Sequence, residues 1–250
     1  LATDPQLRNL LNNREESPII LALSHLNISF FKRFLSSYTQ EELNTAVSPL
    51  FHALKSRKEV FATELIASGA SFGQEIFFDK ERPQSPLSWA IQNNLDQVVI
   101  SILDHPNFRK DSEEALGKDH LSNAIQNNND STIIKRLLLM GFDKRGPISS
   151  PKNPLILAYK KKRKDILKLL LESGLDPSLK NDQNISLNFL VIQEKNYDVL
   201  DLLLQMKVSF NEKYIFKDFS FDMDIFECTA LLYAMQQKDH KIVEKIITAG

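Results

Sequence analysis

The chain has 250 residues, with 31 basic and 32 acidic side chains, 7 glycines and 1 cysteine. A hydrophobic content of 42% is enough to build a core, and a single cysteine excludes an internal disulfide framework. The net charge of −1 argues against bulk nucleic-acid binding, which usually requires a basic face, and the scarcity of glycine leaves little room for phosphate-binding loops.

The start of the chain carries no targeting signal that we can recognise. No basic stretch precedes an apolar region, and no apolar run in the sequence reaches the roughly 20 residues that span a bilayer. Because the chain begins at Leu1 and stops at Gly250, directly after an apolar helical pattern, we expect it to be a fragment of a longer protein. Residues 1–16, where Asp4-Pro5 starts a helix, are predicted to form an N-terminal capping helix or part of a further repeat.

One pattern recurs along residues 17–250: a residue that can cap a helix, often followed by proline, then an apolar residue and, three positions later, a small one. It starts at Ser17, Ser48, Ser85, Asp119, Asn153, Ser186 and Thr229. The copy at Ser186 is the weakest, because Val191 takes the place of the small residue. A capping side chain accepts a hydrogen bond from a free N–H of the first helical turn, and proline at the next position has a fixed φ. The pattern therefore predicts a capped helix at each start.

A second apolar stretch follows each start. In residues 98–103 and 166–171, for example, apolar residues at i, i+1, i+3 and i+4 form one helix stripe. Glycine is expected to end several of these helices, where φ turns positive: Gly69, Gly141, Gly174 and Gly250. The span from cap to glycine is one residue longer in the copy that starts at Asp119, and we expect the extra residue in the turn at residues 127–129.

These residues resemble the ankyrin repeat, a unit of about 33 residues with a turn and two antiparallel helices that opens with T-P-L-H-x-A. The best copy begins at Asn153 and ends at Pro177, and the resemblance extends over residues 17–250. It implies an all-α fold, an ankyrin-like solenoid of about seven helix-turn-helix repeats with irregular hairpin connections. The alternative is another helix-pair solenoid, of the HEAT or tetratricopeptide type. The Ser-Pro-Leu starts and the helix-ending glycines favour the ankyrin repeat.

The chain departs from the family pattern at two positions of the repeat. The family's histidine, which helps to tie neighbouring hairpins, is replaced by Ile20, Phe51, Ser88, Ser122, Ile156, Phe189 and Leu232. The glycine between the two helices is replaced by Asn94, Lys162, Lys195 and Lys238. Asparagine tolerates a left-handed φ fairly well and lysine less readily, so we expect a degenerate and somewhat irregular solenoid.

The resemblance implies a concave face, lined by the ends of the first helices and by the hairpins between repeats, that binds a protein. Amides and lysines recur at these helix ends: Gln92, Asn93, Gln126, Asn127, Lys160, Lys161, Gln193, Gln236 and Gln237. Amides donate and accept hydrogen bonds, which suits a peptide backbone or polar side chains. The alternative is a row of solvated helix ends without a partner.

The longest connection covers residues 208–228 and alternates aromatic with acidic residues. The alternation in residues 219–222 predicts a strand or an extended hairpin, and a connection of this length is usually functional or disordered. One hypothesis is a projecting finger that docks a partner, with Tyr214 and Phe216 as candidate contacts. The other is an enlarged hairpin that packs its phenylalanines over adjacent repeats.

Other features also have a structural and a functional interpretation. Trp89, the only tryptophan, is either a core residue or a binding hot spot. The basic run Lys160–Lys164 is either a solvated helix end or a contact for phosphate, lipid, nucleic acid or an acidic protein. Residues 39–42 match a capping box and residues 111–114 a looser version of it, which predicts short helices in two connections.

The sequence contains no recognisable catalytic or metal-binding motif. H-E-x-x-H, G-x-S-x-G and the P-loop are absent, the five histidines lack metal-ligand spacing, and Cys228 has no evident histidine partner. We therefore expect a non-catalytic module, without cofactor or metal, whose partner is a protein and not a small molecule or nucleic acid. The alternative is a domain that recruits substrates for an enzyme outside this fragment. The composition resembles that of host-directed bacterial effectors and some protist ankyrin proteins, which implies a cytoplasmic protein and, for an effector, delivery into a host cytosol.

Overall fold

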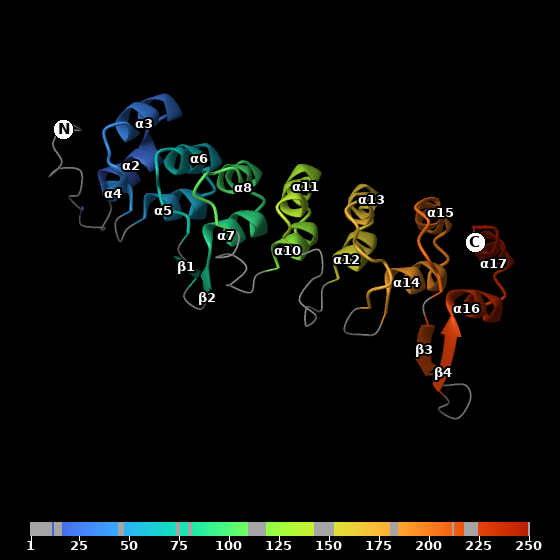
Figure 1. The fold of residues 1–250 in the computed structure, drawn as a ribbon. Helices are drawn as coiled ribbons and strands as arrows, with labels where there is room; N and C mark the ends of the chain where they lie inside the picture. The colour runs from blue at the N-terminus through green and yellow to red at the C-terminus, as the bar shows by residue number, and fades with distance from the viewer. Residues whose placement is uncertain are drawn as a thin grey trace. The chain divides into compact units, whose positions relative to one another are not determined.

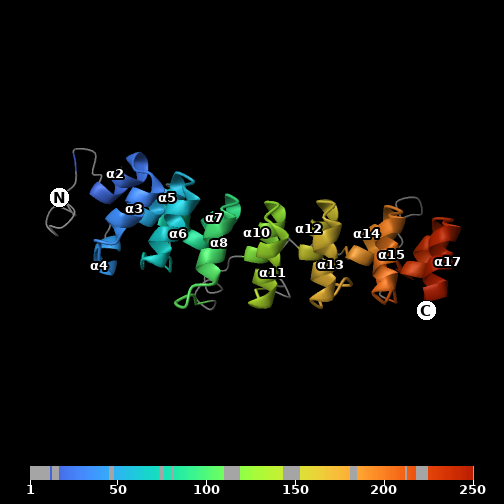
Figure 2. The ribbon, with the colours of Figure 1, turned by 90° about the horizontal axis from the view of Figure 1, so that it is seen from above.

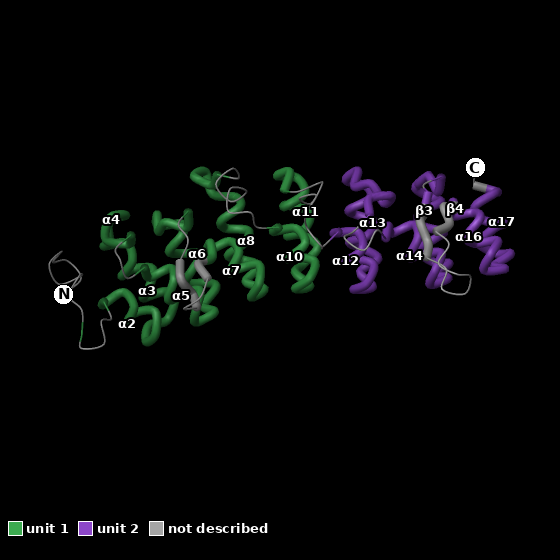
Figure 3. The backbone as a smooth tube through the Cα atoms, turned by 90° about the horizontal axis from the view of Figure 1, so that it is seen from below, with its two compact units in different colours: residues 1–142 green, residues 143–250 purple. Residues whose placement is uncertain are grey.

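The computed structural model describes residues 12, 17–44, 48–73, 76–79, 82–109, 119–142, 153–180, 185–211, 213–217 and 225–249. Within these ranges the chain forms consecutive pairs of short antiparallel helices, and two small β-hairpins lie in the connections (Figure 1). The predicted all-α solenoid is confirmed, with strands only in the hairpins of the described residues. The backbone divides into two compact units, residues 1–142 and 143–250 (Figure 3).

Unit 1 contains four helix pairs in its described part. Their bounds are α2 Pro18–His25, α3 Ile28–Leu35, α5 Pro49–Lys55, α6 Glu59–Ala67, α7 Pro86–Gln92, α8 Asp96–Leu103, α10 His120–Gln126 and α11 Ser131–Leu139. The first helices α2, α5, α7 and α10 pack in sequence in one layer, and the second helices α3, α6, α8 and α11 pack in the other (Figures 1 and 2). A further short helix, α4 Gln40–Leu43, lies in a connection.

Unit 2 repeats this arrangement in its described part. Its helices are α12 Pro154–Lys160, α13 Lys164–Glu172, α14 Leu187–Gln193, α15 Tyr197–Gln205, α16 Ala230–Gln236 and α17 His240–Ala249. The first helices α12, α14 and α16 contact one another in sequence, and α15 contacts α17. Each helix is too short to be stable alone, so packing between pairs supplies most of its stability.

Each predicted start lies immediately before a first helix. The capping side chain accepts a backbone N–H hydrogen bond at Ser48, Ser85, Asp119, Asn153, Ser186 and Thr229. Ser17 is different, since it occupies the cap position before Pro18 but its hydroxyl makes no cap hydrogen bond. The expectation of a side-chain cap is therefore wrong at Ser17, where the extended backbone and Pro18 start the helix without it.

The turn between the two helices has the same backbone conformation in six pairs. Its left-handed residue is Arg57, Asn94, Asn128, Lys162, Lys195 or Lys238, with φ between 52° and 60°. The next residue donates its N–H to the carbonyl of the small residue in the first helix, as in Lys58 to Ala53 at 2.9 Å and Arg163 to Ala158 at 3.0 Å. This Schellman arrangement fixes the turn without glycine. The irregularity expected at these positions is absent because lysine adopts the conformation that glycine has in the family.

Glycine does end the second helices where it was predicted. Gly69, Gly141 and Gly174 have φ of 97°, 74° and 85°, whereas Gly250 lies outside the described residues. After α15 the same position is taken by Lys207, with φ of 57°. The extra turn residue expected in the fourth copy is also confirmed, because two residues separate the left-handed Asn128 from α11 and one separates Lys162 from α13.

The core lies between the helix layers and between neighbouring pairs. The small residues of the first helices are fully buried at Ala53, Ala90, Ala124, Ala158 and Ala234. The stripes of the second helices are buried as well, as at Val98, Val99, Ile102, Ile166, Leu167 and Leu170. Burying one such aliphatic side chain stabilises the fold by about 1.5–3 kcal/mol. Small residues let the first helices approach closely enough for these stripes to meet.

Both hairpins are antiparallel and extend away from the helices (Figure 1). β1 Ile76–Asp79 pairs with β2 Arg82–Gln84, and β3 Lys213–Lys217 pairs with β4 Ile225–Thr229. The extended hairpin predicted in residues 208–228 is thus confirmed, although residues 219–222 themselves lie outside the described ranges. The capping box is confirmed at Thr39 and Glu42, which exchange both hydrogen bonds at the start of α4. Residues 111–114 and the N-terminal helix predicted in residues 1–16 also lie outside the description.

Candidate functional site

The predicted amides and lysines all lie at or just after the C-terminal ends of first helices. In unit 1, Gln92 and Asn93 belong to the end of α7, and Gln126 and Asn127 to the end of the neighbouring α10. In unit 2 the corresponding residues are Lys160 and Lys161 on α12, Gln193 on α14, and Gln236 and Gln237 on α16. Within each unit the contacts between first helices bring these ends side by side.

The glutamines and asparagines of this set differ in how much they are engaged. Gln92 and Gln126 are exposed. Asn93 is half-buried, and its Nδ2 donates to the carbonyl of Trp89 at 3.0 Å. Asn127 does the same with the carbonyl of Asn123 at 2.9 Å. The two asparagines therefore cap their own helices, and the glutamines are the more accessible contacts for a partner.

Side chains at the turns of unit 1 connect each repeat to the next. Lys58 Nζ donates to the Leu23 carbonyl at 2.5 Å, Trp89 Nε1 to the Leu54 carbonyl at 3.4 Å, and Asn129 Nδ2 to Asp96 Oδ1 at 2.9 Å. Each bond joins residues from neighbouring helix pairs. These contacts tie adjacent repeats in a chain that lacks the family's histidine. The half-buried Trp89 takes part in this stacking, which supports its structural interpretation.

Two tyrosine–carboxylate pairs connect the turns of unit 2. Tyr159 Oη donates to Glu194 Oε2 at 2.8 Å, and Tyr197 Oη donates to Asp239 Oδ2 at 2.9 Å. Lys195 Nζ lies 3.6 Å from the same Asp239 oxygen. The first pair joins the end of α12 to the turn after α14, and the second joins that turn to the one after α16. The three turns of unit 2 therefore lie in a continuous row.

The pKa values follow from these contacts. Burial raises the pKa of Tyr159 to about 12, and the hydrogen bond to Glu194 adds to the shift. Burial opposes ionisation of Asp239, but the N–H of Ile242, the hydroxyl of Tyr197 and the ammonium group of Lys195 outweigh it and lower the pKa of Asp239 below its ordinary value. Asp239, which is 7% exposed, consequently stays ionised at neutral pH and caps α17.

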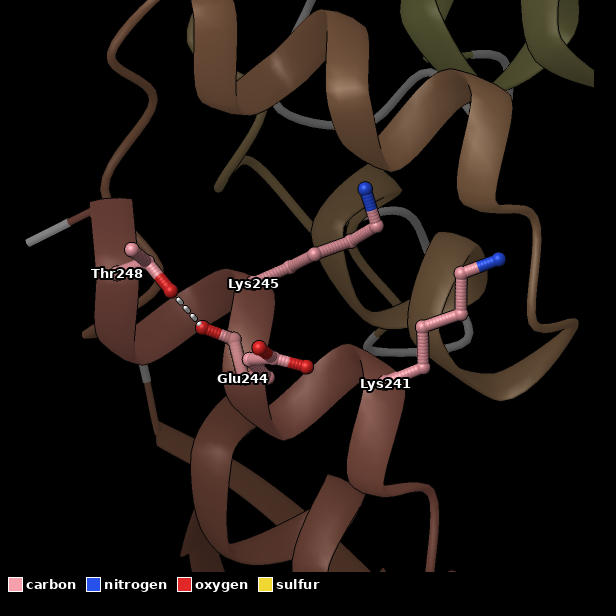
Figure 4. A pocket seen from close by; sticks show the side chains of 4 residues that line it. All are labelled: Lys241, Glu244, Lys245 and Thr248. Atoms are coloured by element: carbon pink, nitrogen blue, oxygen red, sulfur yellow. Dashed lines mark hydrogen bonds between the residues drawn. The ribbon is translucent and has the colours of Figure 1, made fainter.

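A shallow hollow of about 440 Å³ lies beside α17, lined by Lys241, Glu244, Lys245 and Thr248 (Figure 4). Both lysines already serve the packing of α17 on α15. Lys245 Nζ bonds to Asp201 Oδ1 at 2.5 Å, and Lys241 Nζ lies 4.3 Å from the centre of the Tyr197 ring. The Thr248 hydroxyl donates to the carbonyl of Glu244 on the same helix. The hollow therefore lies where α17 packs on α15, and we do not interpret it as a ligand pocket.

The hairpin candidates Tyr214 and Phe216 lie in β3, opposite Cys228 and Phe226 of β4. The base of the hairpin is held by unit 2. Lys180 Nζ donates to the backbone carbonyl of Lys213, the first residue of β3, at 2.9 Å.

Sequence reasoning missed an apolar surface on α16. Leu232 and Met235 are 54% and 49% exposed, whereas the equivalent Phe189 and Ile192 of α14 are 7% and 2% exposed. The earlier residues are covered by the next helix pair, and within the described residues no pair covers α16 on that side. The sequence does show an apolar residue, Leu232, at the family's histidine position. Whether such a residue is exposed depends on whether another helix pair follows it in the array.

The described residues give no sign of a metal centre or a membrane segment. Within them, no three His, Cys, Asp or Glu side chains come together as metal ligands would. None of the helices in these ranges combines the length and the apolar character that crossing a bilayer requires.

The stacked helix pairs, their capped starts and their left-handed turns define a helical-repeat solenoid protein. Residues 121–214 match the family model of ankyrin repeats, in three copies. Together with the structural matches below, which show the same fold, this match supports an ankyrin repeat family for the chain. The comparison with curated protein sequences gives no match.

Two solved structures illustrate the likeness of the fold. The ankyrin repeat domain of Bcl-3, described as a unique member of the IkappaB protein family, matches with a TM-score of 0.64 and 18% sequence identity, over 92% of this chain and 98% of that one. The ankyrin repeat protein EF0377 matches with a TM-score of 0.54 and 22% identity, over 75% of this chain and 96% of that one. At these identities the likeness shows the fold and leaves the partner open.

Proposed function

We propose that the chain is a non-catalytic protein-binding module that contacts its partner through the ends of its first helices and its hairpins. Ankyrin repeats generally mediate protein–protein interaction, and their fold is typically non-catalytic. The observation that carries the proposal is the recurrence of exposed glutamines at equivalent helix ends, Gln92 and Gln126 in unit 1 and Gln193 and Gln236 in unit 2. Their neighbours at the turns are used to join repeats, so these amides are available for recognition.

The hairpin of β3 and β4 supplies the second part of the proposed surface. It extends away from the helices, its first residue Lys213 accepts a hydrogen bond from Lys180, and its paired strands contain Tyr214, Phe216 and Phe226. Aromatic residues are enriched at the centres of protein interfaces because they bury a large area with few rotatable bonds. These features support the finger hypothesis for this connection.

A paired mutational experiment tests the proposal. One variant carries alanine at Gln92, Gln126 and Lys161; its control carries alanine at Gln97, Gln205 and Lys168, which are exposed on second helices and match the change in residue types. We expect the first variant to capture less partner protein from the source cells than the wild type and the control do, while all three unfold at similar temperatures. Unchanged capture by the first variant would count against the helix ends.

Deletion of residues 212–224 tests the hairpin separately. If this connection is a binding finger, the variant that lacks residues 212–224 keeps the unfolding temperature of the wild type and captures less partner protein. If it packs over the repeats, the deletion lowers the unfolding temperature. The two hypotheses therefore differ in a single thermal scan combined with the capture experiment.

A substrate-recruiting domain of a larger enzyme is the second candidate function. The same surface would then position a protein substrate, and catalytic motifs would lie in sequence beyond these residues. A role as a host-directed effector in the cytosol is supported by composition alone. Immunoblotting of cell fractions with an antibody against this chain tests that location.

A further inference from the structure

The turns of unit 2 place a lysine at the left-handed position of every described helix pair. The three residues are Lys162, Lys195 and Lys238, whereas unit 1 has Arg57, Asn94 and Asn128. A residue with a Cβ is strained in this conformation by about 1–2 kcal/mol, and asparagine accepts it more easily than lysine. A strained residue type that recurs at one structural position points to a use for its side chain.

These lysines extend the basic run at the end of α12. Lys160, Lys162 and Lys164 are exposed, and Lys161 is half-buried. In the part of the chain that the structure describes, none of these four makes an ion pair. The carboxylate of the adjacent Asp165 forms an ion pair with Arg163, and Arg163 Nη2 lies 3.0 Å from Asp165 Oδ2. We call the resulting surface the basic turn edge; it consists of Lys160, Lys161, Lys162, Lys164, Lys195 and Lys238.

Two of the carboxylates beside the basic turn edge accept hydrogen bonds from other residues of the chain. Glu194 accepts the hydroxyl of Tyr159, and the buried Asp239 accepts the hydroxyl of Tyr197 and the N–H of Ile242. Asp239 also forms an ion pair with Lys195, whose Nζ lies 3.6 Å away, so within the basic turn edge Lys195 is the lysine whose charge is partly balanced. Asp198 is the exposed carboxylate at these turns that remains. Because the tyrosine–carboxylate pairs hold the turns in a row, the lysines of adjacent repeats form one positively charged strip.

We infer that the basic turn edge binds a carboxylate-rich segment of the partner protein. The inference rests on the proposed function and names the chemistry of the partner. The exposed amides Gln193, Gln236 and Gln237 lie at the helix ends that lead into Lys195 and Lys238, and they suit a peptide backbone, while the ammonium groups suit its acidic side chains. Nucleic acid fits less well, since the chain has a net charge of −1 and the edge offers no row of exposed aromatic residues for stacking bases.

The test is a titration with a defined probe, a labelled synthetic peptide rich in aspartate and glutamate. A peptide of equal length with asparagine and glutamine in their place is its uncharged control. The edge variant carries Lys160→Gln, Lys164→Gln and Lys162→Asn. The matched variant carries Lys135→Gln, Lys168→Gln and Lys207→Asn, which removes the same charge and also replaces one left-handed lysine.

We expect the wild-type chain and the matched variant to bind the acidic peptide with similar affinity, weakening as salt is added. The edge variant should bind it about tenfold more weakly, because three modest charge pairs are lost. Equal loss in both variants, or no preference for the acidic peptide over its uncharged control, overturns the inference. Tighter edge-dependent binding of a duplex RNA or of phosphatidylserine vesicles overturns it as well.

This outcome is separable from that of the proposed function. If the edge variant still binds the acidic peptide while the alanine variant at Gln92, Gln126 and Lys161 loses the captured protein, the module binds proteins and the edge assignment is wrong. If no protein is captured by any form of the chain, the proposed function itself fails.

Discussion

The two helix ends of a repeat reach the same left-handed backbone with different residues. Second helices end at Gly69, Gly141 and Gly174, whereas the helix–helix turns use arginine, asparagine or lysine at the same φ. In both places the residue that follows donates its N–H to a carbonyl in the preceding helical turn, as Ala70 does to Leu65 and Arg163 to Ala158. Hydrogen bonding and packing thus set this conformation, and glycine only lowers its cost.

The largest expected effect comes from the residue whose carbonyl closes the turn. Ala124 is fully buried and accepts the N–H of Asn129 at 3.0 Å. Replacing Ala124 with leucine overfills the packed core around α10, which should lower the free energy of unfolding by about 1–3 kcal/mol. Chemical denaturation measures this change, with the exposed Gln126→Leu as the control that should stay within about 0.5 kcal/mol of the wild type.

A smaller loss is expected when Asp239 is removed. Asp239→Ala leaves α17 without its cap and the hydroxyl of Tyr197 without its acceptor, which should cost about 1–2 kcal/mol. Tyr197→Phe in the same background should then have almost no further effect. A double-mutant cycle by urea denaturation measures the coupling, and additive effects would show that the pair does not link the two turns.

Glycine and lysine substitutions separate the two kinds of left-handed position directly. A Cβ at Gly174 meets no atom within 4 Å, so Gly174→Ala should lose only conformational strain, about 1 kcal/mol. Lys162→Gly should gain up to about 1 kcal/mol, because relief of strain exceeds the added backbone entropy of the unfolded chain. Thermal or chemical unfolding measures both. A loss at Lys162→Gly would mean that the lysine is not strained there.

The smallest effect concerns alkaline pH. The unfolded chain releases the Tyr159 proton near pH 10.0, whereas the folded chain keeps it until about pH 12. This group therefore contributes stability below pH 10.0 that is lost as the pH rises towards 12. The difference in stability between the wild type and Tyr159→Phe should shrink over this interval. A constant difference would contradict the raised pKa.

Much of the local structure could be predicted because its determinants are close together in the sequence. A cap such as Ser85, the proline after it and a glycine such as Gly174 act within one helical turn. Intrinsic propensity disfavours lysine at the left-handed positions, and the hydrogen bond from Arg163 to Ala158 overrides that propensity.

The contacts that join repeats could not be predicted from local pattern. Tyr159 and Glu194 are 35 positions apart, and Tyr197 and Asp239 are 42 apart, so their pairing depends on how the turns stack. The candidate glutamines were located correctly at the helix ends. The distinction between them and the self-capping Asn93 required the side-chain contacts.

The most direct test of the account uses Lys162→Gly and Lys238→Gly together. Both lysines are exposed at left-handed positions of unit 2. If lysine is kept there for its charge despite the strain, the double variant will unfold at a higher denaturant concentration and bind the acidic peptide more weakly than the wild type. A variant that is equally stable or less stable, or that binds the peptide as tightly as before, would contradict the account.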